Sequence, residues 1–130
     1  MALEVVSYLD TNVVFRLANG DVDLISDKAK RQIERTNVLI SGIVLLELEM
    51  LREKGRLKIT AGEILADLSQ RIGLAVCQIP MAAIVADSLE IKWTRDPGDR
   101  LIVANAVSNN RAPLITADRV IRENYPNSIW

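Results

Sequence analysis

The stretch Leu3-Glu-Val-Val-Ser-Tyr-Leu-Asp10 decides the interpretation of the fold. Its apolar and β-branched residues are typical of a buried strand, which is predicted to end at Asp10. Thr11 and Asn12 follow at once and suit the cap of a short helix, for which Gly20 is the expected stop. A buried strand that leads directly into a helix indicates an α/β protein.

The rest of the chain alternates between the two kinds of element. Further strands are predicted at residues 37–41, 74–79, 112–116 and 128–130. Further helices are predicted from residue 26 onward and at residues 43–54, 61–72, 81–91, 97–108 and 118–123. Thr60 and Glu63 have the spacing of a capping box, and Asp96-Pro97 suits a helix start. Such alternation implies a sheet covered on both faces, so we predict one α/β domain over residues 1–130, with three layers and a mostly parallel sheet of four to five strands.

The composition restricts the possible chemistry. The chain has one cysteine and no histidine, which excludes an internal disulfide, Ser-His or Cys-His nucleophiles and the common zinc sites. Any catalysis must therefore use carboxylates, Lys, Arg, hydroxyls or a metal bound by oxygen atoms. The net charge of −1 argues mildly against a nucleic-acid binder, although a cation bound among acids would reverse the local field.

The N-terminal residues Met-Ala-Leu-Glu-Val-Val do not form a secretory signal. The apolar runs are far shorter than a membrane span. We therefore expect a cytoplasmic protein with no membrane partner.

Two aspartates are predicted at the ends of strands. Asp10 ends the first strand, and Asp118 follows Leu114-Ile115-Thr116. In open α/β sheets, sites form at the carboxyl ends of the strands, so the two carboxylates would converge if these strands are neighbours. The alternative is that each aspartate only caps the helix that follows it.

Glu47 is predicted to lie on the buried face of its helix. The residues three and four positions away are Ile43, Val44, Met50 and Leu51, which are all apolar. A buried carboxylate requires a cation, a hydrogen-bond partner or a proton. The alternative is a structural salt bridge with an arginine from elsewhere in the chain.

Asp99 shows the same pattern, since Ile102 and Val103 share its helix face. Asp96 lies at the mouth of this helix instead. Stabilisation of the helix N-terminus explains Asp96 well and Asp99 less well, because Asp99 is on the apolar face. Several converging acids without His or Cys favour a site for Mg²⁺ or Mn²⁺, and hydrolysis of a phosphodiester is the natural reaction for such a site.

Four segments together resemble the motifs of PIN domains, and in particular of VapC-type toxins, the ribonuclease half of toxin–antitoxin pairs. In chain order they are Tyr8-Leu-Asp-Thr-Asn12, Leu46-Glu-Leu48, Arg95-Asp-Pro-Gly-Asp-Arg-Leu-Ile-Val-Ala104 and Leu114-Ile-Thr-Ala-Asp118. The resemblance extends from the first strand to the terminal Ser-Ile-Trp. It implies the PIN-like form of the three-layer fold and a metal-dependent endoribonuclease.

The resemblance also implies roles for individual residues. Asp10, Asp99 and Asp118 would hold the metal. Glu47 would complete the acidic pocket and orient the attacking water, and Asp96 would assist. Supporting hydroxyl and amide groups would come from Thr11, Asn12, Ser41 and Thr116, for which simple capping and strand-end hydrogen bonds remain the alternative.

Partners are implied in the same way: a homodimer, a small antitoxin protein whose tail enters the site, and structured RNA such as transfer RNA. The chain departs from related sequences at Thr94, where a histidine is common, and at Gly98, where a bulky aromatic residue is common. Basic side chains that could line an RNA path, or simply form a solvated face, are Arg52, Lys54, Arg56, Lys58, Lys92, Arg95 and Arg100.

Two other classes of function are considered. A non-catalytic PIN-like module would use the acids to bind a partner's arginine, or would bind RNA without cleaving it. A phosphatase or phospho-receiver of similar architecture is disfavoured, because position 12 is Asn rather than the second Asp of such phosphatases, and no Lys follows the strand before Asp118.

Overall fold

The computed structural model describes residues 5–130, in which the strands form one sheet. The strands are β1 (Val6–Leu9), β2 (Asn37–Ile40), β3 (Ala75–Val76), β4 (Leu114–Ile115) and β5 (Ser128–Ile129). The helices are α1 (Thr11–Ala18), the short 3-10 helix η1 (Val22–Leu24), α2 (Asp27–Arg35), α3 (Gly42–Glu53), α4 (Ala61–Ile72), α5 (Met81–Ser88), α6 (Pro97–Ser108) and α7 (Arg119–Asn124).

The sheet has the strand order β3-β2-β1-β4-β5, and all of its neighbouring pairs are parallel. The predicted α/β fold with a mostly parallel sheet of four to five strands is therefore confirmed. The first strand occupies the centre, which fits its buried residues Tyr8 and Leu9. Since β1 and β4 are neighbours, the carboxyl ends of both strands lie side by side at one edge of the sheet.

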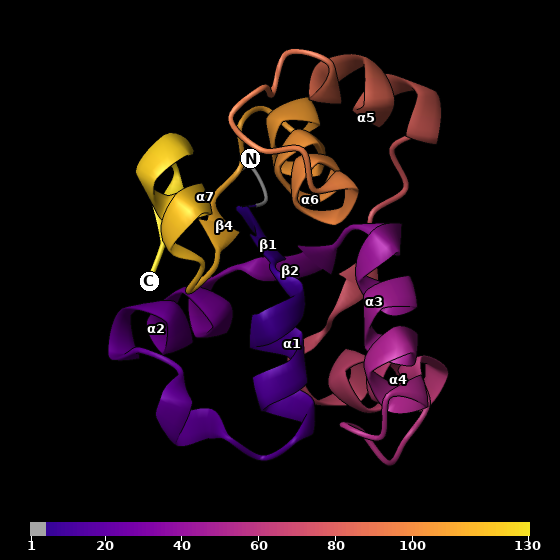
Figure 1. Cartoon of the computed structure of the whole chain (residues 1–130). Helices are drawn as coiled ribbons and strands as arrows, with labels where there is room; N and C mark the ends of the chain where they lie inside the picture. The colour runs from indigo at the N-terminus through magenta and orange to yellow at the C-terminus, as the bar shows by residue number, and fades with distance from the viewer. Residues whose placement is uncertain (1–4) are drawn as a thin grey trace.

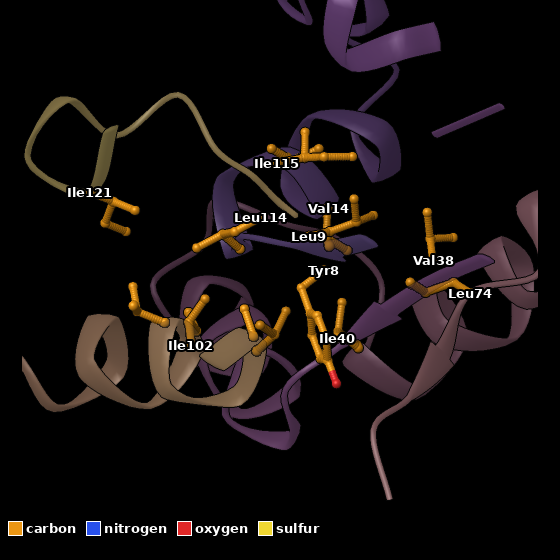
Figure 2. Packing of buried hydrophobic residues seen from close by; sticks show 14 of the residues in the cluster. Tyr8, Leu9, Val14, Val38, Ile40, Leu74, Ile102, Leu114, Ile115 and Ile121 are labelled. Carbon is orange, nitrogen blue, oxygen red and sulfur yellow. The ribbon is translucent and has the colours of Figure 1, made fainter. Parts of the chain in front are cut away.

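Helices cover both faces of the sheet. Figure 1 shows α5 and α6 on one side of β1 and β2, and α1 and α2 on the other. The core consists mainly of aliphatic side chains from both faces. Figure 2 shows Tyr8 and Ile40 on the side of Ile102, with Val14 and Ile115 on the opposite side. Helix α3 contacts α1, α4 and α6, and so it lies beside the edge where the strands end.

The helix starts are the part of the local structure that the sequence predicts best. Ser26 accepts a hydrogen bond from the backbone N–H of Ala29, and Thr60 and Glu63 form the predicted capping box. Asp96 caps α6 as expected, with Pro97 in the first turn. The first cap is predicted wrongly, because Asp10 itself, and not Thr11 or Asn12, caps α1.

Several predicted elements are too long. Strand β4 is limited to the two residues that pair with β1, and β3, at the sheet edge, to the two that pair with β2. Helix α5 ends at Ser88 rather than residue 91. At this end the Ser88 hydroxyl donates to the Val85 carbonyl, and the Ser88 carbonyl accepts from Arg100. In the first predicted strand, Leu3 and Glu4 lie outside the described residues. No helix in the described part of the chain is long and apolar enough to span a bilayer.

Candidate active site

A cavity of about 250 Å³ opens at the edge of the sheet where the strands end. It brings together four acidic side chains from different parts of the chain: Asp10, Glu47, Asp99 and Asp118. The other residues that line it are Thr11, Asn12, Met50, Leu51 and Lys54. The walls thus come from the start of α1, the C-terminal half of α3 and the residue after it, the first turn of α6 and the residue before α7.

Asp10 is the most buried of these acids, with 5% of its surface exposed. One carboxylate oxygen accepts a hydrogen bond from the backbone N–H of Thr11 (2.8 Å), and the other accepts from the hydroxyl of Thr116 (2.6 Å). Burial raises the pKa of Asp10, as does the negative charge of Asp118, and these two hydrogen bonds act in the opposite direction. Asp10 is therefore fixed in orientation at the floor of the cavity.

Thr116 joins the ends of the two central strands. Its side chain is fully buried, donates to Asp10 and accepts from the backbone N–H of Asp118 (3.0 Å). Asp118 in turn caps α7 by accepting from the N–H of Ile121 (2.9 Å). Asp10 and Asp118 thus each cap a helix and also line the same cavity. Capping alone does not describe either residue.

Glu47 lies at the edge of the buried face of α3 rather than on it. That face is centred on Val44 and Leu48, while Met50 is 45% exposed, so the prediction of a buried stripe through Glu47 needs this correction. Glu47 is half-buried, and its Oε1 accepts a hydrogen bond from the hydroxyl of Thr11 (2.6 Å). Burial is the main cause of its raised pKa. No salt bridge within residues 5–130 involves Glu47, so the alternative of a structural ion pair is not found there.

Gly98 makes room for Glu47. A Cβ atom at this position would lie 2.5 Å from Oε2 of Glu47 and 3.1 Å from its Cδ. Real Cβ atoms do not approach so closely, and Gly98 is buried. The glycine that sequence analysis treats only as a departure from related sequences therefore permits α6 to pass directly over the Glu47 carboxylate. No sequence signal reveals this role, since it depends on the distance between α3 and α6.

Asp99 is the half-buried acid whose ionisation is most strongly disfavoured. Burial, followed by the negative charges of Asp96, Asp10, Asp118 and Glu47, raises its pKa from 3.8 to about 7. Within residues 5–130, no ion pair compensates its charge. Asp96 is exposed, accepts from the N–H of Asp99 (2.9 Å) and is not among the residues that line the cavity.

The remaining predicted site residues take different positions. Asn12 lines the cavity with an exposed side chain, as does Lys54. Ser41 is buried at the start of α3, makes no capping hydrogen bond with its side chain and does not line the cavity. Of the basic residues considered for an RNA path, Arg52 pairs with Glu49 on its own helix, and Arg100 donates to the Ser88 carbonyl.

The donor set fits a hard divalent cation, because the cavity offers carboxylate oxygens from four residues. A cation would also favour the charged forms of Asp10, Glu47 and Asp99, whose pKa values are raised. The four acidic side chains do not form a closed set of metal ligands in this structure. In residues 5–130 no three acidic, histidine or cysteine side chains approach closely enough to count as a metal cluster. Binding would therefore require these side chains to move toward a common ion.

The parallel sheet and the acidic cavity at its edge define an α/β protein with a site of oxygen donors. The PIN domain family matches residues 7–125, and the chain belongs to this family. PIN domains are generally nucleases that use divalent metal ions. Comparison with curated proteins gives no significant match.

Among solved structures, the chain is similar to one described as VapBC2 from Rickettsia felis bound to a DNA fragment from their promoter. The TM-score is 0.67 at 20% identity, over 97% of this chain and 100% of that chain. This similarity supports the fold independently of the family match.

Proposed function

We propose that this chain is a metal-dependent endoribonuclease that hydrolyses RNA phosphodiester bonds, and that it acts, as one domain over residues 1–130, as the toxin of a VapBC-type pair. The observation that carries the proposal is the cavity in which Asp10, Glu47, Asp99 and Asp118 meet. Within the described residues these acids have no basic partner in an ion pair, so they are available to a cation.

Asp10, Asp99 and Asp118 would hold the ion, which we propose to be Mg²⁺ or Mn²⁺. When bound, such an ion supplies positive charge that stabilises the developing charge on a phosphodiester. Asp10 is suited to this role because its two hydrogen bonds fix the carboxylate before the ion arrives. Asp99 is suited because a nearby positive charge would remove the repulsion that now raises its pKa.

Glu47 would orient the attacking water and accept its proton. The hydroxyl of Thr11 donates to Oε1 of Glu47, while Oε2 lies beside Gly98 and accepts no hydrogen bond within residues 5–130. Thr11, Asn12, Ser41 and Thr116 would be supporting residues, with Thr116 acting through Asp10. Asp96 would assist only through its charge, because it lies outside the cavity lining.

The resemblance of the motifs to VapC-type sequences supports three parts of the proposal: the RNA substrate, the role as a toxin and the partners. A small antitoxin protein and a second copy of this chain are the proposed partners, and structured RNA such as transfer RNA is the proposed substrate. The similar structure of VapBC2 contains both members of such a pair.

The test is cleavage of a fluorescently labelled RNA by the purified protein with Mg²⁺, with Mn²⁺ and with EDTA. We expect cleavage only with a divalent ion, and a loss of at least about 100-fold in Asp10→Asn and Asp99→Asn. Asp67→Asn is a matched control, since Asp67 is an exposed acid on α4 paired with Arg71, and it should leave cleavage unchanged. Cleavage that persists in EDTA or in Asp10→Asn would contradict the proposal.

The second candidate is a non-catalytic PIN-like module that binds a protein or RNA. The absence of a closed metal cluster within residues 5–130 is the observation in its favour. Tight binding of a partner, together with no heat of Mg²⁺ or Mn²⁺ binding in calorimetry and no cleavage of RNA, would replace the first proposal by this one.

A further inference from the structure

A second cavity, of about 530 Å³, shares no lining residue with the acidic site. Its walls come from α2, α7, β5 and the residues on either side of β5, and Figure 1 shows α2, α7 and the C-terminus near one another. The lining residues are Lys28, Arg119, Arg122, Glu123, Pro126, Ser128 and Trp130. None of them belongs to the proposed catalytic machinery.

The charge of this cavity is positive, in contrast to the net charge of −1 of the whole chain. Lys28, Arg119 and Arg122 stand against the single acid Glu123. Arg119 pairs with Glu123 at 2.9 Å, but their side chains are 88% and 58% exposed, so solvent screens this pair and it contributes little. The arginine is therefore free to turn toward a stronger anion.

Trp130 gives the cavity an aromatic wall. The Arg16 guanidinium carbon lies 5.3 Å from the centre of the Trp130 ring, and Arg16 also donates to the Leu24 carbonyl (3.0 Å). The half-buried indole is thereby held in place beside a further positive charge. Basic side chains combined with an aromatic surface are the means by which proteins bind single-stranded nucleic acid, through phosphate contacts and base stacking. An acidic peptide would use the charges but not the ring.

The second cavity is formed by elements that are neighbours of those forming the acidic site. Arg119 directly follows Asp118, which lines the acidic cavity, and β5 is the neighbour of β4. The basic cavity therefore adjoins the acidic one through the start of α7 and the β4-β5 pair. We infer that the cavity of Lys28, Arg119, Arg122 and Trp130 binds the phosphates and one base of an RNA strand beside the bond to be cleaved. This inference rests on the proposed function, whose site it extends.

The experiment measures the dissociation constant of a labelled single-stranded RNA for the full chain carrying Asp10→Asn, with and without Lys28→Gln, Arg119→Gln or Arg122→Gln. Each charge removed should weaken binding by about 3- to 10-fold and reduce the slope of log K against log salt by about 0.7, the value for one phosphate of a single strand. Arg71→Gln is the matched control, because Arg71 forms an equivalent i,i+4 pair with Asp67 on α4 and is 54% exposed. It should change neither quantity.

A second readout reports on the aromatic wall. With Trp93→Phe, the remaining tryptophan is Trp130, and RNA should change its fluorescence at the concentrations at which RNA binds. Steady-state cleavage by the chain with intact Asp10 should show a raised KM and an unchanged kcat in Lys28→Gln and Arg122→Gln.

The outcomes separate this inference from the proposed function. If the chain cleaves RNA but Lys28→Gln and Arg122→Gln bind it as tightly as the parent, the inference is overturned and the proposed function stands. If RNA binding depends on these residues but no cleavage occurs, the basic site stands and the nuclease proposal fails. Polyglutamate that competes with RNA at equal charge concentration would overturn the inference in favour of an acidic protein partner.

Discussion

The contact between Gly98 and Glu47 predicts that the effect of Gly98→Ala on the free energy of unfolding changes sign when the Glu47 carboxylate is removed. In Gly98→Ala, the new Cβ would lie 2.5 Å from Oε2 of Glu47, so the carboxylate must move. Its movement would weaken the hydrogen bond from the hydroxyl of Thr11. Gly62 supplies a matched control, because it is also the second residue of a helix and its nearest neighbour to a Cβ is 3.9 Å away.

The magnitude follows from two opposing effects. Alanine favours a helix over glycine by up to about 1 kcal/mol, and Gly62→Ala should show this gain. A hydrogen bond to a charged group contributes about 1.5–3 kcal/mol, and the half-exposed Glu47 belongs at the lower end. We therefore expect Gly98→Ala to lower the free energy of unfolding by about 0.5–2 kcal/mol.

The assay is urea unfolding of a double-mutant cycle with Glu47→Ala. Without the Glu47 carboxylate the clash disappears, and Gly98→Ala should then stabilise the protein, as Gly62→Ala does. The coupling between positions 47 and 98 should be about 1.5–3 kcal/mol. Equal effects of Gly98→Ala in both backgrounds would refute the reasoning, whatever their size.

Three further predictions concern the site and the fold. Thr116→Val leaves an oxygen of buried Asp10 without its partner, and should destabilise the protein by about 1–3 kcal/mol in urea unfolding; a change below about 0.5 kcal/mol would contradict this. In metal-free protein the pKa of Asp99 lies near 7, above its ordinary 3.8. Between these pH values the folded state holds a proton that the unfolded state has lost. The free energy of unfolding should therefore fall as pH rises from 4 to 7. Asp99→Asn should flatten this pH dependence, and an unaltered profile would count against the raised pKa. Thr60→Ala removes the capping box with Glu63 and should lower stability by about 1 kcal/mol without changing RNA cleavage.

The fold is predictable from the sequence where its causes are local. The caps at Ser26, Thr60 and Asp96 are recognisable because a cap involves residues two or three positions apart. The ends of β3 and β4 are not, because they depend on pairing with strands that are distant in the sequence. Likewise, the end of α5 is in contact with Arg100, twelve residues beyond Ser88, and no local pattern contains this contact.

The features of the site also divide into those that a local pattern in the sequence predicts and those that it does not. Asp10 and Asp118 are predictable because parallel strands end at one edge, and that rule needs only the strand positions. The bond from Thr116 to Asp10 and the passage of Gly98 over Glu47 are contacts across 106 and 51 positions, which no local pattern contains. The helix-face argument for Glu47 overstates its burial, because the buried residues of α3 are Val44 and Leu48 and Glu47 lies at the edge of their face.

The central claim is that Asp10, Asp99 and Asp118 share one divalent ion in the acidic cavity. A crystal structure of the chain grown with Mn²⁺, with the ion located by its anomalous scattering, tests this most directly. The account predicts one or more peaks inside the cavity, in contact with carboxylate oxygens of all three residues. Peaks found only elsewhere on the protein, or a peak that Asp99→Asn leaves in place at full occupancy, would contradict it.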